Sequence, residues 1–244
     1  MLICLICLIW CVYYSYADGL GITVMQTDWV IWQLADSAFP SGGFAHSGGL
    51  ESTLQWHEVD RQRFPEFVRA YLIQIGHGSL PIVIAAHRKP EQIVRLDGFC
   101  NTFYSNHVAN RASRIQGRSF LASAEAAFAS QGIQKVRGLL NRGRIVGHFP
   151  SMFGVVAATL QLHARQAKRL FLFVTMRSLI SSAIRLGIVG TLNGQAIQYQ
   201  IGPLCERIAQ KCGTFRPEEV AQTAPVIDVL QATHDRLYSR LFQS

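Results

Sequence analysis

Apolar residues recur along most of this chain at the spacing of helices rather than of strands. Between residues 64 and 75 they fall at positions i, i+3, i+4 and i+7, which places them on one face of a helix. Residues 168–188 contain L-F-L-F-V at positions 170–174, a run that alone would suit a strand, but helical spacing continues to the end of the segment. Since no convincing pair of alternating strands remains, we predict an all-α fold, a single-domain helical bundle.

Glycine and proline predict where these helices begin and end. The helix that starts near Phe64 should stop at Gly76-His77-Gly78, and Pro81 should start the next one. Residues 99–128 should form two helices or one bent helix, with Gly117 as the weak point and Gly132 as the stop. Residues 137–147 hold three glycines and three arginines with little periodicity, and they are predicted to be a loop.

The C-terminal half should hold four more helices, counting the one over residues 168–188. Pro150 suits the first turn of a helix that runs to about His163, apolar almost all round and therefore buried. After Gly190, a helix should run from about residue 193 to residue 212. Thr223 can cap, and Pro225 can begin, a final helix. Its predicted apolar stripe consists of Val226, Leu230, Leu237 and Leu241, with Arg236 and Arg240 on another face.

The N-terminus is the most apolar part of the chain. Its apolar run from Leu2 to Val12 has 11 residues, whereas a helix that spans a bilayer needs about 20. Ser15-Tyr16-Ala17 resembles a signal-peptide cleavage site, but no Lys or Arg precedes the run. A secretory signal, a membrane-touching anchor and an extension from an uncertain start site all stay open. We therefore expect a hydrophobic extension over residues 1–26, one helical domain over residues 27–244, and no stable membrane span.

Composition indicates a folded protein that has partners. With 49% hydrophobic and 16% charged residues, the chain can bury a sizeable core and is not disordered. At this hydrophobicity, so low a charged fraction suggests more apolar surface than a solitary monomer would expose, which favours partner proteins or an oligomer. The net charge of 23 − 15 = +8 permits nucleic acid, an acidic membrane or an acidic protein as partner. Six cysteines are too few for a disulfide framework in a chain of this length, which favours a reducing compartment.

Residues 32–51, the glycine-rich segment, read W-Q-L-A-D-S-A-F-P-S-G-G-F-A-H-S-G-G-L-E, with four glycines in eight positions. Such glycines indicate torsions closed to other residues, or close approach by another chain or a ligand. A phosphate-binding loop is excluded, because Gly49-Leu50 stands where Lys and Ser/Thr would be required. A hydrolase elbow around Ser47 would need a preceding strand. Because the chain before Ser47 is predicted to be helical, a tight turn in which Ser41 or Ser47 caps a helix is favoured. A serine hydrolase that uses Ser47 is kept as the alternative.

Histidines and basic residues carry no complete motif. The eight histidines lack a close ligand spacing such as H-E-x-x-H, and His46 and His57 could share a helical side only if a helix began before His46. The basic stretch between residues 107 and 144 has no helix-turn-helix, zinc finger or interleaved aromatics, so a solvated face or protein-docking patch is favoured over nucleic acid. A basic nucleic-acid-binding module is the second alternative. The stretch contains Arg111, Arg114, Arg118, Lys135, Arg137, Arg142 and Arg144.

The glycine-rich segment resembles the N-terminal signature of the UreF family of urease accessory proteins. The resemblance continues in F-G-V-V-A-A-T-L at residues 153–160 and in L-F-V-T-M-R-S-L-I-S-S-A-I-R-L-G-I-V-G at residues 172–190. It also includes D-V-L-Q-A-T-H-D-R-L-Y-S-R-L-F-Q-S at residues 228–244, which is most similar to the plant-type members. It covers about residues 29–244 in the right order, matches residues 88–113 only loosely, and leaves out the hydrophobic extension.

The resemblance implies an all-helical, non-enzymatic chaperone of urease maturation in the cytoplasm. Members of the family dimerise, bind the accessory protein UreD (UreH in some organisms) and recruit the GTPase UreG. The complex delivers nickel to apo-urease, whose active-site lysine must be carbamylated. On this basis we expect no tightly bound cofactor and no catalytic or metal-ligating residue, with nickel as the delivered ion.

The resemblance also assigns partner-binding residues. In the glycine-rich segment these are Pro40, Gly42, Gly43, Phe44, His46, Ser47, Gly48, Leu50 and Glu51, which are expected at the dimer and UreD-facing surface. In the C-terminal part, the matching residues belong to a segment that in this family orders on partner binding. They are Leu237, Tyr238, Arg240 and Leu241.

Overall fold

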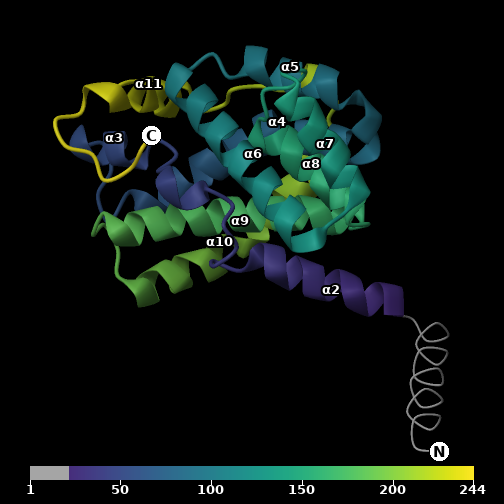
Figure 1. Ribbon diagram of the computed structural model, residues 1–244. Helices are drawn as coiled ribbons and strands as arrows, with labels where there is room; N and C mark the ends of the chain where they lie inside the picture. The colour runs from purple at the N-terminus through teal and green to yellow at the C-terminus, as the bar shows by residue number, and fades with distance from the viewer. Residues whose placement is uncertain (1–21) are drawn as a thin grey trace, which may run out of the picture.

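The computed structural model describes residues 22–244, and in this part of the chain it is helical, with no strand (Figure 1). This confirms the predicted all-α class. Most of the expected N-terminal extension lies outside the described residues, and α2 (Ile22–Ala35) runs across the expected boundary at residue 26. The boundary therefore stays a prediction.

Ten helices of the described chain are connected by short loops and single 3-10 turns. After α2 they are α3 (Leu50–Gln55), α4 (Phe64–Arg88), α5 (Ile93–Phe103), α6 (His107–Phe128), α7 (Gln131–Asn141), α8 (Phe149–Thr159), α9 (Ala164–Arg185), α10 (Thr191–Lys211) and α11 (Pro225–Ala232). The 3-10 turns are η1 (Gly43–Ala45), η2 (Pro90–Gln92), η3 (Cys212–Thr214), η4 (Pro217–Glu219) and η5 (His234–Arg236).

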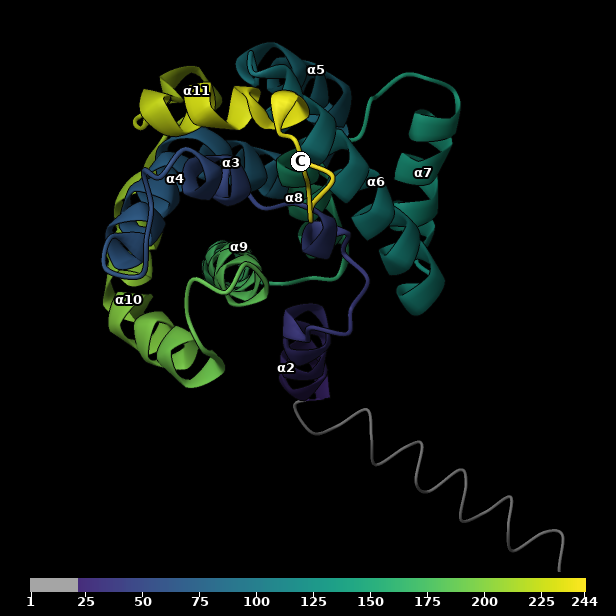
Figure 2. The ribbon, with the colours of Figure 1, turned by 90° about the vertical axis from the view of Figure 1, so that its left-hand side faces the viewer.

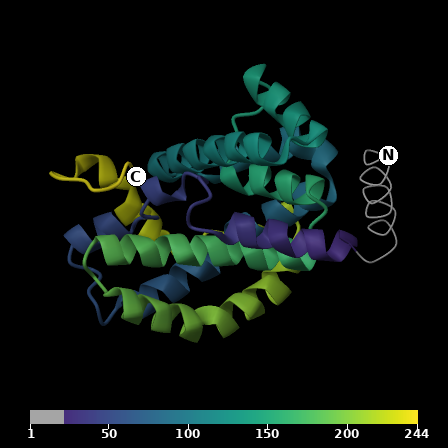
Figure 3. The ribbon, with the colours of Figure 1, turned by 60° about the horizontal axis from the view of Figure 1, so that its bottom comes forward.

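Helix α9 forms the axis of the domain. Figure 2 shows it end-on, with α2, α3, α4, α8 and α10 around it. Its Phe171 packs against Phe149 and Phe153 of α8, with ring centroids 5.6 Å and 5.2 Å away. Helix α2 lies along α9 (Figure 3), and the Arg177 guanidinium donates a hydrogen bond to the Ala35 carbonyl at its end. The predicted burial of α8 is confirmed, since its residues 149–157 are buried.

Helix α4 continues where a break was predicted, so the expected stop at residues 76–78 is wrong. The glycines serve close packing there: a Cβ on Gly76 would lie 2.3 Å from Ile208 Cγ2. Pro81 has no N–H for the carbonyl of His77, one turn earlier. That carbonyl accepts a hydrogen bond from the Ala221 N–H at 3.2 Å instead. Among the described residues, α4 is the one helix long and apolar enough to cross a membrane, and 61% of the window concerned is buried inside the domain.

Two more predicted boundaries need correction. Residues 99–128 do belong to two helices, but the break lies at residues 104–106, where the Asn106 side chain accepts from the Val108 N–H at 3.0 Å. Gly117 lies inside α6, and a Cβ there would be 2.3 Å from the Gly147 carbonyl oxygen. Residues 137–141 are helical, so the predicted loop begins only after α7. Helices α9 and α10 agree with their predicted ranges within a few residues.

The predicted final helix is too long. Helix α11 ends at Ala232, a 3-10 turn follows, and residues 237–244, here called the tail, are irregular. The helix ends here because His234 is buried and its Nε2 bonds to the Glu51 carboxylate at 3.0 Å. The chain then turns back toward the glycine-rich segment. The predicted leucine stripe and arginine face therefore do not form on one helix.

Candidate functional site

The structure brings the glycine-rich segment and the tail into direct contact. The Gln243 N–H donates to the Ala45 carbonyl at 2.9 Å, and the Ser47 N–H donates to the Ser244 carbonyl at 2.7 Å. The Ser244 hydroxyl lies 2.5 Å from His46 Nδ1. Two parts of the chain about 200 positions apart thus form one continuous site.

The buried Glu51 side chain holds the tail in place by hydrogen bonds. Its carboxylate accepts from three groups at once. The Leu241 N–H donates to Oε1 at 2.5 Å, while the Phe242 N–H and His234 Nε2 lie 3.2 Å and 3.0 Å from Oε2. Hydrogen bonds to a buried charged group are among the stronger ones in proteins. Glu51 therefore positions the tail rather than facing a partner itself.

The glycines shape the segment. Gly42, Gly48 and Gly49 have φ values of 77°, 63° and 87°, in the left-handed region that side chains rarely adopt. At Gly48 a Cβ would also lie 2.8 Å from the Tyr71 hydroxyl. The expectation of unusual torsions is thus confirmed, whereas the close approach at Gly48 comes from Tyr71 of this same chain and not from another chain or a ligand.

An outward surface forms where the two segments meet. Phe44 is 68% exposed, and the Arg185 guanidinium lies between its ring and that of buried Phe242, at 3.7 Å and 4.2 Å from the two centroids. Tyr238 is fully exposed and Leu241 is 53% exposed. Exposed apolar and aromatic side chains are typical of protein interfaces, and arginine is enriched there. We use the name docking surface for Arg185 and the exposed predicted residues of the two segments, which are Pro40, Phe44, Tyr238, Arg240 and Leu241.

The predicted partner-binding residues therefore divide into three groups by burial. Pro40, Phe44, Tyr238, Arg240 and Leu241 are exposed on the docking surface, whereas Gly42, Gly48 and Leu237 are partly buried. The others are buried and support the surface from inside: Gly43, His46, Ser47, Leu50 and Glu51. Binding of a partner by any of them stays a prediction.

Sequence reasoning missed Arg185, His234 and Phe242 at this site. Arg185 lies in the matching segment 172–190, and His234 and Phe242 lie in the matching segment 228–244. Nothing in the spacing of these residues indicates that they converge in the fold. The one sequence feature that these three residues share is that they lie in segments that carry the family resemblance.

Neither Ser47 nor His46 has the setting of a catalytic residue. The Ser47 hydroxyl is buried and lies 3.4 Å from the Ser244 carbonyl, to which it donates. Burial lowers the pKa of His46 to about 4, with smaller contributions from Arg111 and His234, so its imidazole is neutral at pH 7. His57 lies after α3, which begins after His46, so the two histidines do not share a helix. Among residues 22–244, no cluster of three His, Cys, Asp or Glu side chains could hold a metal ion.

Part of the basic stretch forms hydrogen bonds and ion pairs with other residues of this chain. Arg111 forms a two-pronged contact with Asp235 at 2.7 Å and 3.0 Å, next to the tail. Arg137 lies 3.7 Å from Glu125, and Arg118 Nε donates to the Val146 carbonyl at 2.8 Å. The stretch is therefore only partly available to a partner.

Comparisons with known proteins give the family. The UreF family model matches residues 59–202. The chain is 36% identical over 222 residues to urease accessory protein F of Oryza sativa subsp. indica, covering 88% of this chain and 84% of the relative. It is 34% identical over 224 residues to urease accessory protein F of Arabidopsis thaliana, covering 88% and 92%. It is 29% identical over 217 residues to urease accessory protein UreF of Paenarthrobacter aurescens, covering 87% and 96%. The chain therefore belongs to the UreF family of urease accessory proteins.

Proposed function

We propose that this chain is an accessory protein of urease maturation that acts with UreD (UreH) and the GTPase UreG to deliver nickel into apo-urease. Family membership supports the role, and the docking surface is the observation that supports a protein-binding mechanism. Phe44 in the glycine-rich segment and Tyr238 and Leu241 in the tail expose apolar area, Arg185 lies over the Phe44 ring, and Arg240 is an exposed cation of the tail that lies 3.5 Å from Asp235. Aromatic and arginine side chains in such a cluster are the residue types enriched at interfaces.

The chain acts by assembly rather than by catalysis. Nickel is cargo of the complex, and no tightly bound cofactor is part of the proposal. We further propose a homodimer in the cytoplasm, with no nucleic acid and no stable membrane span. The docking surface, including the residues behind it, is assigned to UreD and to the dimer contact.

The test is complementation of cells that lack the gene, combined with co-purification of the chain with its cognate UreD and UreG. Tyr238→Ala should reduce both urease activity and recovery of the partners. Tyr199→Ala is the matched control, because Tyr199 is 86% exposed on α10, which contacts neither η1 nor α3 closely. If Tyr238→Ala behaves like Tyr199→Ala in both assays, the docking surface is wrongly assigned.

The two alternatives receive no support from a specific contact. The Ser47 hydroxyl bonds to a backbone carbonyl rather than to a base, so Ser47→Ala should cause no hydrolytic defect. Esterase activity of the purified chain that disappears in this variant would restore the hydrolase hypothesis. Retention of the chain on heparin or DNA at physiological salt would restore the nucleic-acid hypothesis.

A further inference from the structure

Positive charge is concentrated in the middle of the chain. Residues 98–205 contain 12 Lys and Arg but a single acidic residue, Glu125. The rest of the chain holds the remaining 11 Lys and Arg together with 14 Asp and Glu. The middle part therefore has a formal charge of 12 − 1 = +11, against 11 − 14 = −3 for the rest. Such a separation gives a strong local potential wherever the cations meet on one surface.

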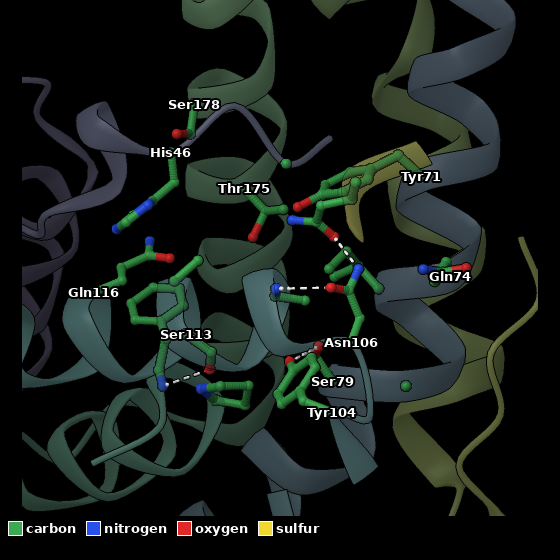
Figure 4. A pocket seen from close by; sticks show the side chains of 18 of the residues that line it. His46, Tyr71, Gln74, Ser79, Tyr104, Asn106, Ser113, Gln116, Thr175 and Ser178 are labelled. Atoms are coloured by element: carbon green, nitrogen blue, oxygen red, sulfur yellow. Dashed lines mark hydrogen bonds between the residues drawn. The ribbon is translucent and has the colours of Figure 1, made fainter. Parts of the chain in front are cut away.

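Helix α6 presents part of this charge to solvent. Its inner side lines an internal cavity, where Figure 4 shows Ser113 and Gln116. Because side chains three or four positions apart lie on the same side of a helix, Arg114 and Arg118 lie together, on a side of α6 that does not face the cavity. Ile115 lies between them and is 38% exposed. The outer side of α6 thus combines two cations with exposed apolar area.

Helix α7 continues this surface, and Figure 2 shows it beside α6 at the outer edge of the domain. The Arg144 N–H donates to the Leu139 carbonyl at 3.0 Å, so Arg144 lies against the end of α7. Lys135 and Arg142 are exposed on α7 and are seven positions apart, which is two turns or about 10 Å along one side. The name basic face is used below for Arg114, Arg118, Lys135, Arg142 and Arg144.

The basic face has no counter-charge within the described protein. No ion pair among residues 22–244 includes any of its five cations. Glu125, the one acidic residue of the middle part, lies 3.7 Å from Arg137 instead. Elsewhere in the fold, five arginines do lie within 4 Å of a carboxylate: Arg95, Arg111, Arg169, Arg216 and Arg240. The basic face is therefore free to pair with carboxylates of another molecule.

A shallow groove along α7 gives the basic face a shape as well as a charge. It is lined by residues at helical spacing, which are Gln131, Gln134, Lys135, Gly138, Leu139 and Arg142. Gly138 leaves room for the Arg142 guanidinium, whose Nη1 would lie 3.4 Å from a Cβ at that position. The guanidinium therefore lies across the groove rather than pointing away from it. A carboxylate that enters the groove meets Arg142 there and Lys135 one or two turns away.

The surface between the cations favours a protein over a nucleic acid. Single-stranded nucleic acids stack their bases on exposed aromatic rings. Between residues 107 and 147, however, no Phe, Tyr or Trp side chain is exposed. The exposed Ile115 and the half-buried Leu139 and Leu140 supply aliphatic area instead. Four of the five cations are arginines, which are enriched at protein interfaces and bind carboxylates in a two-pronged geometry.

We propose that the basic face binds an acidic segment of a partner protein, whose carboxylates pair with Lys135 and Arg142 in the groove. This site is separate from the docking surface. Arg111 marks the border, because it contacts Asp235 beside the tail at 2.7 Å and lies seven positions before Arg118 on α6. One chain can therefore hold an acidic partner while its docking surface is occupied.

The proposal is tested with three anionic probes on the purified full chain at physiological salt. Fluorescein-labelled decaglutamate and labelled undecathymidylate, which has ten phosphate linkages, are followed by fluorescence anisotropy. Vesicles that contain phosphatidylserine are followed by co-sedimentation. Decaglutamate should bind most tightly, and its affinity should fall as salt is raised. Absence of decaglutamate binding, or binding of the oligonucleotide or the vesicles at least as tightly, would overturn the proposal.

Two double variants locate the site. Lys135→Glu with Arg142→Glu should weaken decaglutamate binding at least tenfold, because two attractions become repulsions. Arg207→Glu with Lys211→Glu is the matched control, since it changes the net charge equally on exposed positions of α10, on the other side of the domain (Figure 2). An equal loss in both double variants would show that only net charge matters and would refute the assignment.

Thermal melts check that both double variants fold. If Lys135→Glu with Arg142→Glu does not fold, the milder Lys135→Gln with Arg142→Gln takes its place, and Arg207→Gln with Lys211→Gln becomes its control. The milder pair on α7 should still weaken binding of decaglutamate more than the pair on α10. Equal affinities in these two variants would count against the basic face in the same way.

Discussion

Glu51→Gln should release the tail while the rest of the domain stays folded. The change keeps the size of the side chain, but a carboxamide has one oxygen where the carboxylate has two. The carboxylate accepts at Oε1 from the Leu241 N–H and at Oε2 from the Phe242 N–H and His234 Nε2. Whichever way the carboxamide turns, its NH₂ group faces at least one buried donor.

The size of the effect follows from these contacts. One buried hydrogen bond to a charged group is lost, worth about 1.5–3 kcal/mol, and the others weaken because the charge is gone. We expect a total of about 3 kcal/mol against the docked tail, which corresponds to a roughly hundredfold larger population of the undocked tail. Burial of Phe242, worth about 2 kcal/mol, favours the docked tail equally in both proteins and therefore does not change this ratio.

Hydrogen exchange followed by mass spectrometry measures this directly. Peptides that cover residues 237–244 should lose protection in Glu51→Gln, whereas peptides from α4 and α9 should keep theirs. Glu58→Gln, an exposed position just after α3, is the matched control. If the tail amides of Glu51→Gln exchange at the rate of the unmodified chain, the carboxylate does not hold the tail.

Three further predictions use other parts of the structure. In thermal melts, Gly76→Ala should destabilise the domain by about 1–3 kcal/mol, because its Cβ would lie 2.3 Å from Ile208 Cγ2. Gly98→Ala is the control: nothing lies within 4 Å of its Cβ, and it should stabilise the domain by about 0.5–1 kcal/mol. The unfolded chain takes up a proton at His46 that the folded chain excludes, so stability should fall as pH drops from 6.5 to about 4. Melts of His46→Gln should show a smaller loss over that window, and an equal loss would contradict the buried neutral imidazole. Arg240→Ala should weaken recruitment of the GTPase and lower urease activation without a change in Tm, since Arg240 is exposed; normal complex assembly on a sizing column would remove its partner role.

The fold class could be predicted because helical periodicity is a local property, but the helix ends depended on distant residues. Gly76 and Pro81 are ordinary signs of a break, and they lie inside α4 because Ile208 packs on the glycine and Ala221 satisfies the carbonyl that the proline leaves open. No pattern within α4 contains that information. The predicted length of the last helix was wrong for the same reason, since His234 Nε2 bonds to the carboxylate of Glu51, which lies 183 positions earlier.

The candidate site was predictable as two separate segments and not as one surface. Each segment carries its own family resemblance, and the left-handed glycines follow from the unusual density of glycine. Sequence reasoning treated His46, Ser47 and Glu51 as contact residues because they stand in the signature. The structure buries them, since they bind the tail.

The contact between the glycine-rich segment and the tail also sets when the docking surface can form. His46 and Ser244 are 198 positions apart, and closing so long a loop has a large entropic cost until the intervening helices have packed. The two segments therefore meet late in folding, after nearly the whole chain has been synthesised. A nascent or partly folded molecule therefore does not present the assembled docking surface.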